Sequence, residues 1–297
     1  KKGHSLLREA KDVKFAFVDQ YKGPLTQVEL CTLLEVSDRG YRAWRIRPMS
    51  KRQRDDMVFL AHIREHHRLS LKTYGRPRMT EELKEAGFIV GHRRVGRLMR
   101  DNDITVVRTH KFKATTDSVH NLTVAPNVLN RDFTANGPNQ KWAGDITYIW
   151  TNEGWLYLAV IIDLYSRRVI GWAVSNRMKK DLAIRALQMA INLRNPPSGC
   201  IHHTDRGSQY CAHAYQKILN QNGFLVSMSR KGNCWDNAVS ETFFKTLKAE
   251  LIWHQHWQTR RQVEGALFQY INGFYNPRRR HSALGWKSPL AFERKAA

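Results

Sequence analysis

The chain is 297 residues long, which suggests one to three domains, and 49 Lys and Arg against 26 Asp and Glu give it a net charge of +23. This excess favours a polyanionic partner, DNA or RNA, over an anionic membrane surface or a merely basic soluble protein. An apolar run of about 18 residues is absent, which excludes a transmembrane helix, and the basic start lacks the apolar segment of a signal peptide.

The cysteine usage indicates a reducing compartment. No CxxC pair occurs among the four cysteines, Cys31, Cys200, Cys211 and Cys234. We therefore expect no disulfide framework and a cytoplasmic location. The lack of a long apolar run predicts that the protein has no membrane partner.

Residues 1–50 contain a first candidate helix-turn-helix segment, LTQVELCTLLEVSDRGYRAWR. An apolar stripe predicts its first helix: Val28, Leu30, Leu33 and Leu34. Ser37 is expected to cap the second helix, because a Ser hydroxyl accepts from the free backbone amides of a helix start. That second helix carries Arg39, Arg42 and Arg45, so we expect it to face DNA.

Residues 51–113 contain a second candidate, YGRPRMTEELKEAGFIVGHRRVGRLMRDND. Here Thr80 is expected to cap a helix that runs through Ala86 and ends at Gly87. Apolar side chains predict the buried face of the next helix: Val95, Leu98 and Met99. Its basic face is expected to bind DNA through Arg93, Arg94, Arg97 and Arg100.

A histidine-rich helix precedes this second segment, with His62, His66 and His67 close together. Zinc is not favoured, because no cysteine pair follows at ligand spacing. We expect a helix surface that faces solvent or DNA.

Residues 114–140 differ in composition from what surrounds them. They hold 1 basic and 2 acidic residues, whereas 1–113 has a net charge of +12. Pro, Asn and Gly with little periodicity predict an extended linker between the DNA-binding part and a second domain.

Residues 141–253 show alternating strand and helix patterns. The predicted strands are KWAGDITYIW, WLYLAVIIDLYS, RRVIGWAVS, SGCIHHTDRG and FLVSMSR, and the predicted helices are KKDLAIRALQMAINLR, AHAYQKILNQNG and AVSETFFKTLKAELI. The first helix should bury Leu182, Ala183, Ala186, Leu187, Met189 and Ala190. This order, βββαβαβα, predicts an α/β fold with a mixed five-stranded sheet and flanking helices.

Three of the eight acidic residues in this stretch fall where a metal site would need them. Asp145 is central in the first strand, Asp205 follows the fourth, and Glu241 begins the last helix. Converging carboxylates favour Mg²⁺, with Mn²⁺ as a substitute, and two such ions catalyse in-line displacement at phosphorus. The structural alternatives are a paired core Asp, a turn Asp and a solvated helix Glu.

Residues around Glu241 add detail. Lys245 and Lys248 share its helix face, so we expect them to bind phosphates, the alternative being ordinary Glu–Lys surface pairs. Asn237 is expected to cap the helix or orient a ligand.

The last segment, 254–297, is basic and contains aromatic residues. We expect the aromatic residues to dock on the core, and we expect three arginines to face DNA: Arg278, Arg279 and Arg280. The alternative is a solvated tail.

The motifs WAGDITYI, HHTDRGSQY and WDNAVSETFFKTLKAEL, followed by YINGFYNPRRRHSALGWKSPLAFE, resemble those of the bacterial insertion-sequence transposases with a retroviral-integrase-like core, commonly made by frameshifting between two reading frames. The 35 residues between Asp205 and Glu241 match the spacing of that family's second and third carboxylates. The resemblance runs from about Tyr74 to Glu293.

The resemblance implies a ribonuclease-H-like fold, a D-D-E triad at Asp145, Asp205 and Glu241, and Mg²⁺. It also implies a bacterial protein at the nucleoid that recognises terminal inverted repeats, assembles at least as a dimer on paired double-stranded DNA ends, and inserts them into target DNA through a circular intermediate. Two alternatives remain: a DNA-binding protein without catalysis, and a nuclease on RNA–DNA hybrids, which would have little use for major-groove readers.

Overall fold

The computed structural model describes residues 7–106, 124–230 and 234–296. Its internal contacts divide the chain into two units, 1–60 and 61–297, and each is described by itself. None of the helices in the described ranges is both long and apolar enough to cross a membrane.

The first unit is a small helical cluster of α2 (Lys11–Gln20), α3 (Gln27–Leu33) and α4 (Asp38–Ile46). Thr26 and Glu29 form a capping box at the start of α3. As predicted, the Ser37 hydroxyl caps α4, accepting from the Gly40 amide at 3.2 Å. Its core consists of Phe15, Val18, Leu30, Cys31, Leu34 and Tyr41.

The predicted apolar stripe of α3 is only half right. Leu30 and Leu34 are buried, but Val28 and Leu33 are 54% and 63% exposed. A helix of seven residues offers one narrow face to its neighbours, and residues four apart occupy that face together.

The second unit begins with a helical region made of α5 (Lys51–Leu69, which starts in the first unit), α6 (Arg76–Glu85) and α7 (His92–Asp101). Gly87 takes a positive φ of 87° just after α6, as the predicted helix end requires. The predicted core face of α7 is confirmed, because Val95, Leu98 and Met99 are buried.

The predicted cap at Thr80 is wrong. Gly75 precedes α6, and Pro77 lies in its first turn, where a missing amide costs least. Thr80 is therefore inside the helix, where its hydroxyl donates to the Arg76 carbonyl at 2.8 Å and is fully buried.

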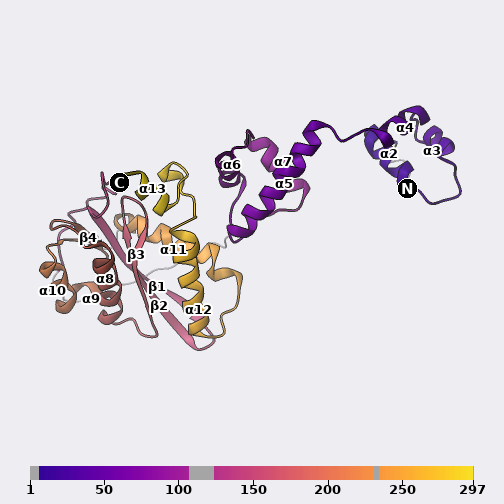
Figure 1. The fold of residues 1–297 in the computed structure, drawn as a ribbon. Helices are drawn as coiled ribbons and strands as arrows, with labels where there is room; N and C mark the ends of the chain where they lie inside the picture. The colour runs from indigo at the N-terminus through magenta and orange to yellow at the C-terminus, as the bar shows by residue number, and fades with distance from the viewer. Residues whose placement is uncertain (1–6, 107–123, 231–233, 297) are drawn as a thin grey trace. The chain divides into compact units, whose positions relative to one another are not determined.

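A mixed five-stranded sheet forms the centre of the second unit (Figure 1). Its strands are β1 (Lys141–Thr151), β2 (Gly154–Asp163), β3 (Val169–Ser175), β4 (Ile201–Thr204) and β5 (Leu225–Met228), in the order β3-β2-β1-β4-β5. β1 is antiparallel to β2 and parallel to β4. The predicted five strands and their order along the chain are confirmed.

Helices cover both faces of this sheet. One face packs against α8 (Lys180–Arg194), α9 (Ser208–Cys211) and α10 (His213–Gln221), and Trp142 and Ile146 of β1 join that core. On the other face, Ala143 packs with Leu129 and with Val239 of α11 (Ala238–Glu250). Since successive side chains of a strand alternate, odd-numbered residues near the start of β1 face α11.

The buried stripe predicted for α8 is confirmed at five of its six positions. Met189 is the exception, because it is 40% exposed and its sulfur accepts from the Trp172 amide at the sheet edge.

Described residues of the predicted linker pack against the sheet. Leu129 is buried, its amide donates to Ser227 Oγ at 3.0 Å, and the Pro126 carbonyl accepts from Met228 of β5 at 3.2 Å. Residues 114–123 of that prediction lie outside the described ranges. From Val124 onward the segment is thus packed against the sheet rather than a free extended linker.

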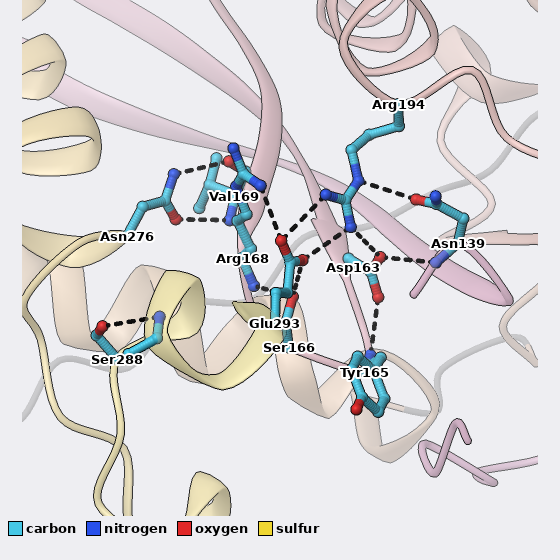
Figure 2. Close-up of polar contacts among 11 residues, drawn as sticks. Asn139, Asp163, Tyr165, Ser166, Arg168, Val169, Arg194, Asn276, Ser288 and Glu293 are labelled. Carbon is cyan, nitrogen blue, oxygen red and sulfur yellow. Dashed lines mark hydrogen bonds and ion pairs between the residues drawn. The ribbon is translucent and has the colours of Figure 1, made fainter. Parts of the chain in front are cut away.

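The C-terminal part packs against the same unit. It comprises η2 (Ile252–His254), α12 (Arg260–Phe268), the π-helical η3 (Gln269–Tyr275), η4 (Ser282–Leu284) and α13 (Pro289–Ala296). Glu293 of α13 accepts from Arg194, Arg168 and Ser166, and Arg194 also pairs with Asp163 at 3.1 Å (Figure 2). The expected docking of this segment on the core is confirmed, since Phe274 and Tyr275 are buried.

Candidate active site

Sheet register places Asp145 and Asp205 beside each other. Ala143 of β1 pairs with His203 of the parallel strand β4, and each aspartate lies two residues further along its strand direction. Asp145 has the same alternation as Ala143, so it faces α11. The Asp205 carboxylate accepts from the Gly207 amide at 2.9 Å, which holds the turn after β4.

Glu241 reaches this place from a helix. It is the fourth residue of α11, whose beginning packs on Ala143 through Val239. The Glu241 side chain is exposed, whereas the neighbouring positions Ser240 and Phe243 are buried. Glu241 therefore lies at the water-facing side of the site.

The three carboxylates act on one another electrostatically. Burial, followed by the negative charges of Asp205 and Glu241, raises the pKa of Asp145 well above its ordinary value. Two influences oppose this rise: the hydrogen bond from the Ile146 amide and the positive charge of Lys248 both lower the pKa of Asp145. Partial burial also raises the pKa of Glu241. The structure thus brings the three predicted residues into one electric field.

The three carboxylates are not arranged as the ligands of one metal ion in this structure. Within the described ranges, no three His, Cys, Asp or Glu side chains are close enough together to hold one metal ion. Oxygen donors of like charge are nevertheless the chemistry that a hard divalent cation requires, and a cation would offset the repulsion that raises the pKa of Asp145. The residue types and their mutual field therefore fit Mg²⁺.

Tyr210 is a neighbour of the site that sequence reasoning missed. Its hydroxyl is buried without a hydrogen-bond partner among the described residues. Burial, then the charges of Asp145 and Asp205, raise the pKa of Tyr210 well above its ordinary value. The sequence feature that could have indicated Tyr210 is its position in the motif HHTDRGSQY, five residues after Asp205.

The two predicted lysines differ. Lys248 Nζ lies 5.0 Å from the centre of the Tyr148 ring, and burial lowers the pKa of Lys248 while the charge of Asp145 raises it. Lys245 is exposed on α11. Lys248 thus contacts the site, and Lys245 faces solvent.

The start of α11 is held by a residue that the sequence did not single out, Asp236. Its carboxylate is fully buried and accepts from Arg131 at 2.8 Å, from Asn127 at 3.0 Å, and from both the amide and the guanidinium of Arg230. Burial raises the pKa of Asp236, but these hydrogen bonds outweigh it and bring the pKa to about 2. The next residue, Asn237, occupies the predicted cap position, but its side chain makes no capping bond.

The arginines of the two helix-turn-helix candidates remain on the surface. Arg39 and Arg42 of α4 are exposed, although Arg42 pairs with Asp38 at 3.0 Å. On α7, Arg93 and Arg100 are exposed, and Arg97 pairs with Asp101 at 3.3 Å. Arg94 of the same helix is partly buried.

Two of the three C-terminal arginines do not have the placement expected for DNA contacts. Arg279 is buried and makes two bonds of 2.7 Å to Glu250. Arg280 bonds Glu82 at 2.6 Å and also pairs with Glu85. Both guanidiniums are paired with carboxylates, so they are not available to bind a phosphate. Arg278 is exposed.

Comparison with known proteins identifies the parts of the chain. Residues 53–112 match the HTH-like domain family. Residues 135–234 match the integrase core domain family, and a further integrase core domain family covers residues 222–289. Among solved structures, the HTLV-2 integrase catalytic core domain in complex with magnesium is 18% identical, with a TM-score of 0.39 over 53% of this chain and 98% of that one.

Curated relatives match nearly the whole chain. A 31 kDa protein of insertion element IS600 from Shigella sonnei is 46% identical over 90% of this chain and 98% of its own length. The transposase InsF of insertion sequence IS3A from Escherichia coli is 42% identical over 95% of this chain and 99% of its own length. The chain therefore belongs to the IS3 family of bacterial insertion-sequence transposases, polynucleotidyl transferases with an integrase core domain.

Proposed function

We propose that this transposase cuts and joins the terminal inverted repeats of its insertion sequence with a D-D-E triad of Asp145, Asp205 and Glu241. The observation that supports this most is the register of β1 and β4, whose last pair, Ala143 and His203, lies two residues before Asp145 and Asp205 on each side. Electrostatic coupling of Asp145 to both other carboxylates supports including Glu241. Carboxylates that repel one another in a partly buried place are typical of functional sites.

The three carboxylates would hold two Mg²⁺ ions, or Mn²⁺ in their place, through oxygen ligands alone. When bound, such ions activate the attacking oxygen and stabilise the leaving oxygen of an in-line displacement at phosphorus. Asp145 and Asp205, fixed by strands and a turn, would supply the rigid ligands. Glu241, exposed on α11, would supply the ligand that is free to adjust.

Other residues of the chain would position the DNA. Lys248, on which the charge of Asp145 acts, would bind an oxygen of the phosphate next to the reacting phosphate. Exposed Lys245, one turn away on α11, would bind a phosphate of the same DNA strand further from the site. The Tyr210 hydroxyl would orient an aspartate oxygen, since it lies in the field of Asp145 and Asp205 without another partner among the described residues.

Recognition of the ends would belong to the helical regions. The exposed arginines of α4 and α7 are Arg39, Arg42, Arg45, Arg93 and Arg100, and Arg94 and Arg97 complete the basic face of α7. Basic second helices of this kind enter a major groove. A multimer, at least a dimer, would hold two DNA ends together and bring them to target DNA. Of the C-terminal arginines, only Arg278 remains in the proposed DNA surface.

A direct test uses a duplex that carries the element's terminal repeat, with Mg²⁺, and follows nicking and strand joining. We expect the Asp205→Asn variant to lose both reactions while it still binds the duplex. The exposed Glu264→Gln variant is the matched control and should react like the wild type. Wild-type nicking by Asp205→Asn would contradict the proposal.

The same assay decides the second candidate, a DNA-binding protein without catalysis. That alternative predicts that the wild type binds the repeat but nicks it with neither Mg²⁺ nor Mn²⁺.

A further inference from the structure

Three aromatic side chains stand exposed where β1 and β2 extend past the rest of the sheet. They are Tyr148, Trp150 and Trp155, hereafter the aromatic platform, and they are 43%, 58% and 43% exposed. The pairing of β2 with β3 ends at Tyr157 and Ser175, so the strands continue beyond β3 at this end (Figure 1). Large rings on a surface are a feature of binding sites, since water favours their burial.

The three rings hold one another in place. Trp155 meets Tyr148 edge-on, with 5.0 Å between ring centres and 85° between planes. It meets Trp150, its partner across the strands, at 4.8 Å and 74°. Mutual edge-to-face packing fixes the rings before any ligand arrives, which lowers the entropy lost on binding.

Positive charge lies at two sides of the platform. Lys248 Nζ lies 5.0 Å from the Tyr148 ring centre, and the Arg260 guanidinium donates to the Trp155 carbonyl at 3.0 Å. An acid is also close to Arg260: Glu153, in the turn between the strands, accepts from the backbone amide of Arg260 at 2.9 Å. Flat apolar rings flanked by a lysine and an arginine match a nucleic-acid strand, which presents π-faces beside phosphates.

The distance to the proposed active site is short. Tyr148 is three residues beyond Asp145 on the same strand, which corresponds to about 10 Å. A DNA strand advances about 3.4 Å for each nucleotide, so this distance spans about three nucleotides. Because side chains alternate along a strand, Tyr148 and Asp145 start from opposite faces of β1. Lys248 connects the two places, because its Nζ lies 5.0 Å from the Tyr148 ring centre and its charge acts on Asp145.

We propose that the aromatic platform stacks unpaired bases of the element end, within a few nucleotides of the phosphate that is cut. This inference rests on the proposed function. Bases next to a reacting phosphate must leave the duplex for the strand to enter a carboxylate site, and stacking on fixed rings stabilises the opened strand without reading its sequence. Lys248 and Arg260 hold the phosphates of that strand.

The test measures binding of two fluorescent strands to the full chain without divalent metal. One is an oligothymidine of about 12 nucleotides, and the other is an abasic phosphodeoxyribose strand of equal length and charge. We expect Trp150→Ala to weaken oligothymidine binding about tenfold and to leave abasic binding unchanged, since each stacked base contributes on the order of 1–3 kcal/mol. Trp150→Phe keeps a ring and should retain most of the affinity. Lys248→Ala should weaken both strands alike.

Equal binding of Trp150→Ala and wild type to both strands would overturn the inference, as would an equal loss on both. Sedimentation of the same variants covers the other possible occupant, a second copy of the chain. A change in subunit number without base-dependent binding would assign the platform to self-association and would also overturn the inference.

A separate experiment, nicking of duplex ends, tests the proposed function. If the wild type does not nick, the proposed function fails, whereas the comparison of the two strands still decides the role of the platform.

Discussion

Two groups of carboxylates in the same unit have opposite surroundings. Asp163 lies across from Trp142 near the start of β1, and with Glu293 it surrounds the guanidinium of Arg194 (Figure 2). Asp145, three residues further along β1, shares its field with two more carboxylates and one lysine. We call these groups the paired cluster and the triad.

The influences on their pKa values show the difference. Burial raises the pKa of Asp163 above its ordinary value, although each further influence on it, from the amides of Asn139 and Tyr165 and from Arg194, lowers it. For Asp145, the next influence after burial is a like charge, which raises the pKa again. Charge pairing makes the first cluster a structural link between α8, the sheet and α13. Repulsion between carboxylates costs stability, and the amide of Ile146 and the charge of Lys248 oppose it at Asp145, so its presence in the triad favours a functional role.

The largest predicted effect separates activity from stability at the triad. Asp145→Asn should lower the rate of end nicking by on the order of 10³-fold or more, because a metal ligand is lost. The same variant should melt at or above the wild-type temperature, because a repelled charge is removed from a partly buried place. Nicking assays and thermal melting of the same preparations check both parts. A variant that loses activity only because it unfolds would break the comparison.

At the paired cluster the effects should be reversed. Glu293→Gln leaves Arg194 and Arg168 with less compensation in a half-buried place, and we expect a loss of about 3 kcal/mol in the free energy of unfolding. Denaturant titration measures it. The exposed Glu264→Gln on α12 is the control and should change stability by less than about 0.5 kcal/mol. Equal stability of both variants would show that the cluster does not hold α13.

Asp236 should behave as a positioning residue between these extremes. Asp236→Asn removes the charge that binds Arg131 and Arg230 and loosens the start of α11, five residues before Glu241. We expect kcat to fall about 10–100-fold while KM for the DNA end changes little. Asp236→Glu, which restores the charge, should recover part of the rate. A rise in KM for the DNA end with unchanged kcat would instead assign Asp236 to the DNA surface.

The smallest expected effect is a pH dependence at His281. Burial, then the positive charges of Arg279, Arg78 and Arg167, lower the pKa of His281 from 6.5 to about 3, and the Tyr275 ring packs on it edge-on. A lowered folded-state pKa stabilises the protein above about pH 6.5, and this contribution is lost as the pH falls towards 3.

Melting temperature should therefore decrease on acidification from pH 7 to pH 5, and less steeply in His281→Asn than in the wild type. The buried His202 and His203, whose pKa values fall to about 3 and about 4, act in the same direction in both proteins. Identical slopes for the two proteins would show that His281 does not stay neutral in the fold.

Local sequence patterns predicted much of this structure because they act over short distances. Ser37 caps α4, and Gly87 follows α6 with a positive φ. The sequence also put Asp145 inside the first strand and Asp205 directly after the fourth, and β1 (Lys141–Thr151) and β4 (Ile201–Thr204) have those bounds.

What failed depended on partners that are remote in sequence. A run of three arginines carries no record that Arg279 will meet Glu250, or that Arg280 will meet Glu82 almost 200 residues away. The buried Asp236 was missed for the same reason, since two of its donors lie in the segment predicted as a linker. The misplaced Thr80 cap is different, because Pro77 was a visible signal for an earlier helix start.

Thermal melting of the full chain against Mg²⁺ tests the central claim most directly, because it reports binding at the triad without DNA. At a concentration of about 100 times the dissociation constant, a bound ion adds about 2.7 kcal/mol, which corresponds to a rise of roughly 5 °C in a protein of this size. We predict this rise for the wild type and for Glu264→Gln, and its loss in Asp145→Asn and Asp205→Asn. An equal rise in all four proteins would place the ion elsewhere and contradict the assignment of the triad.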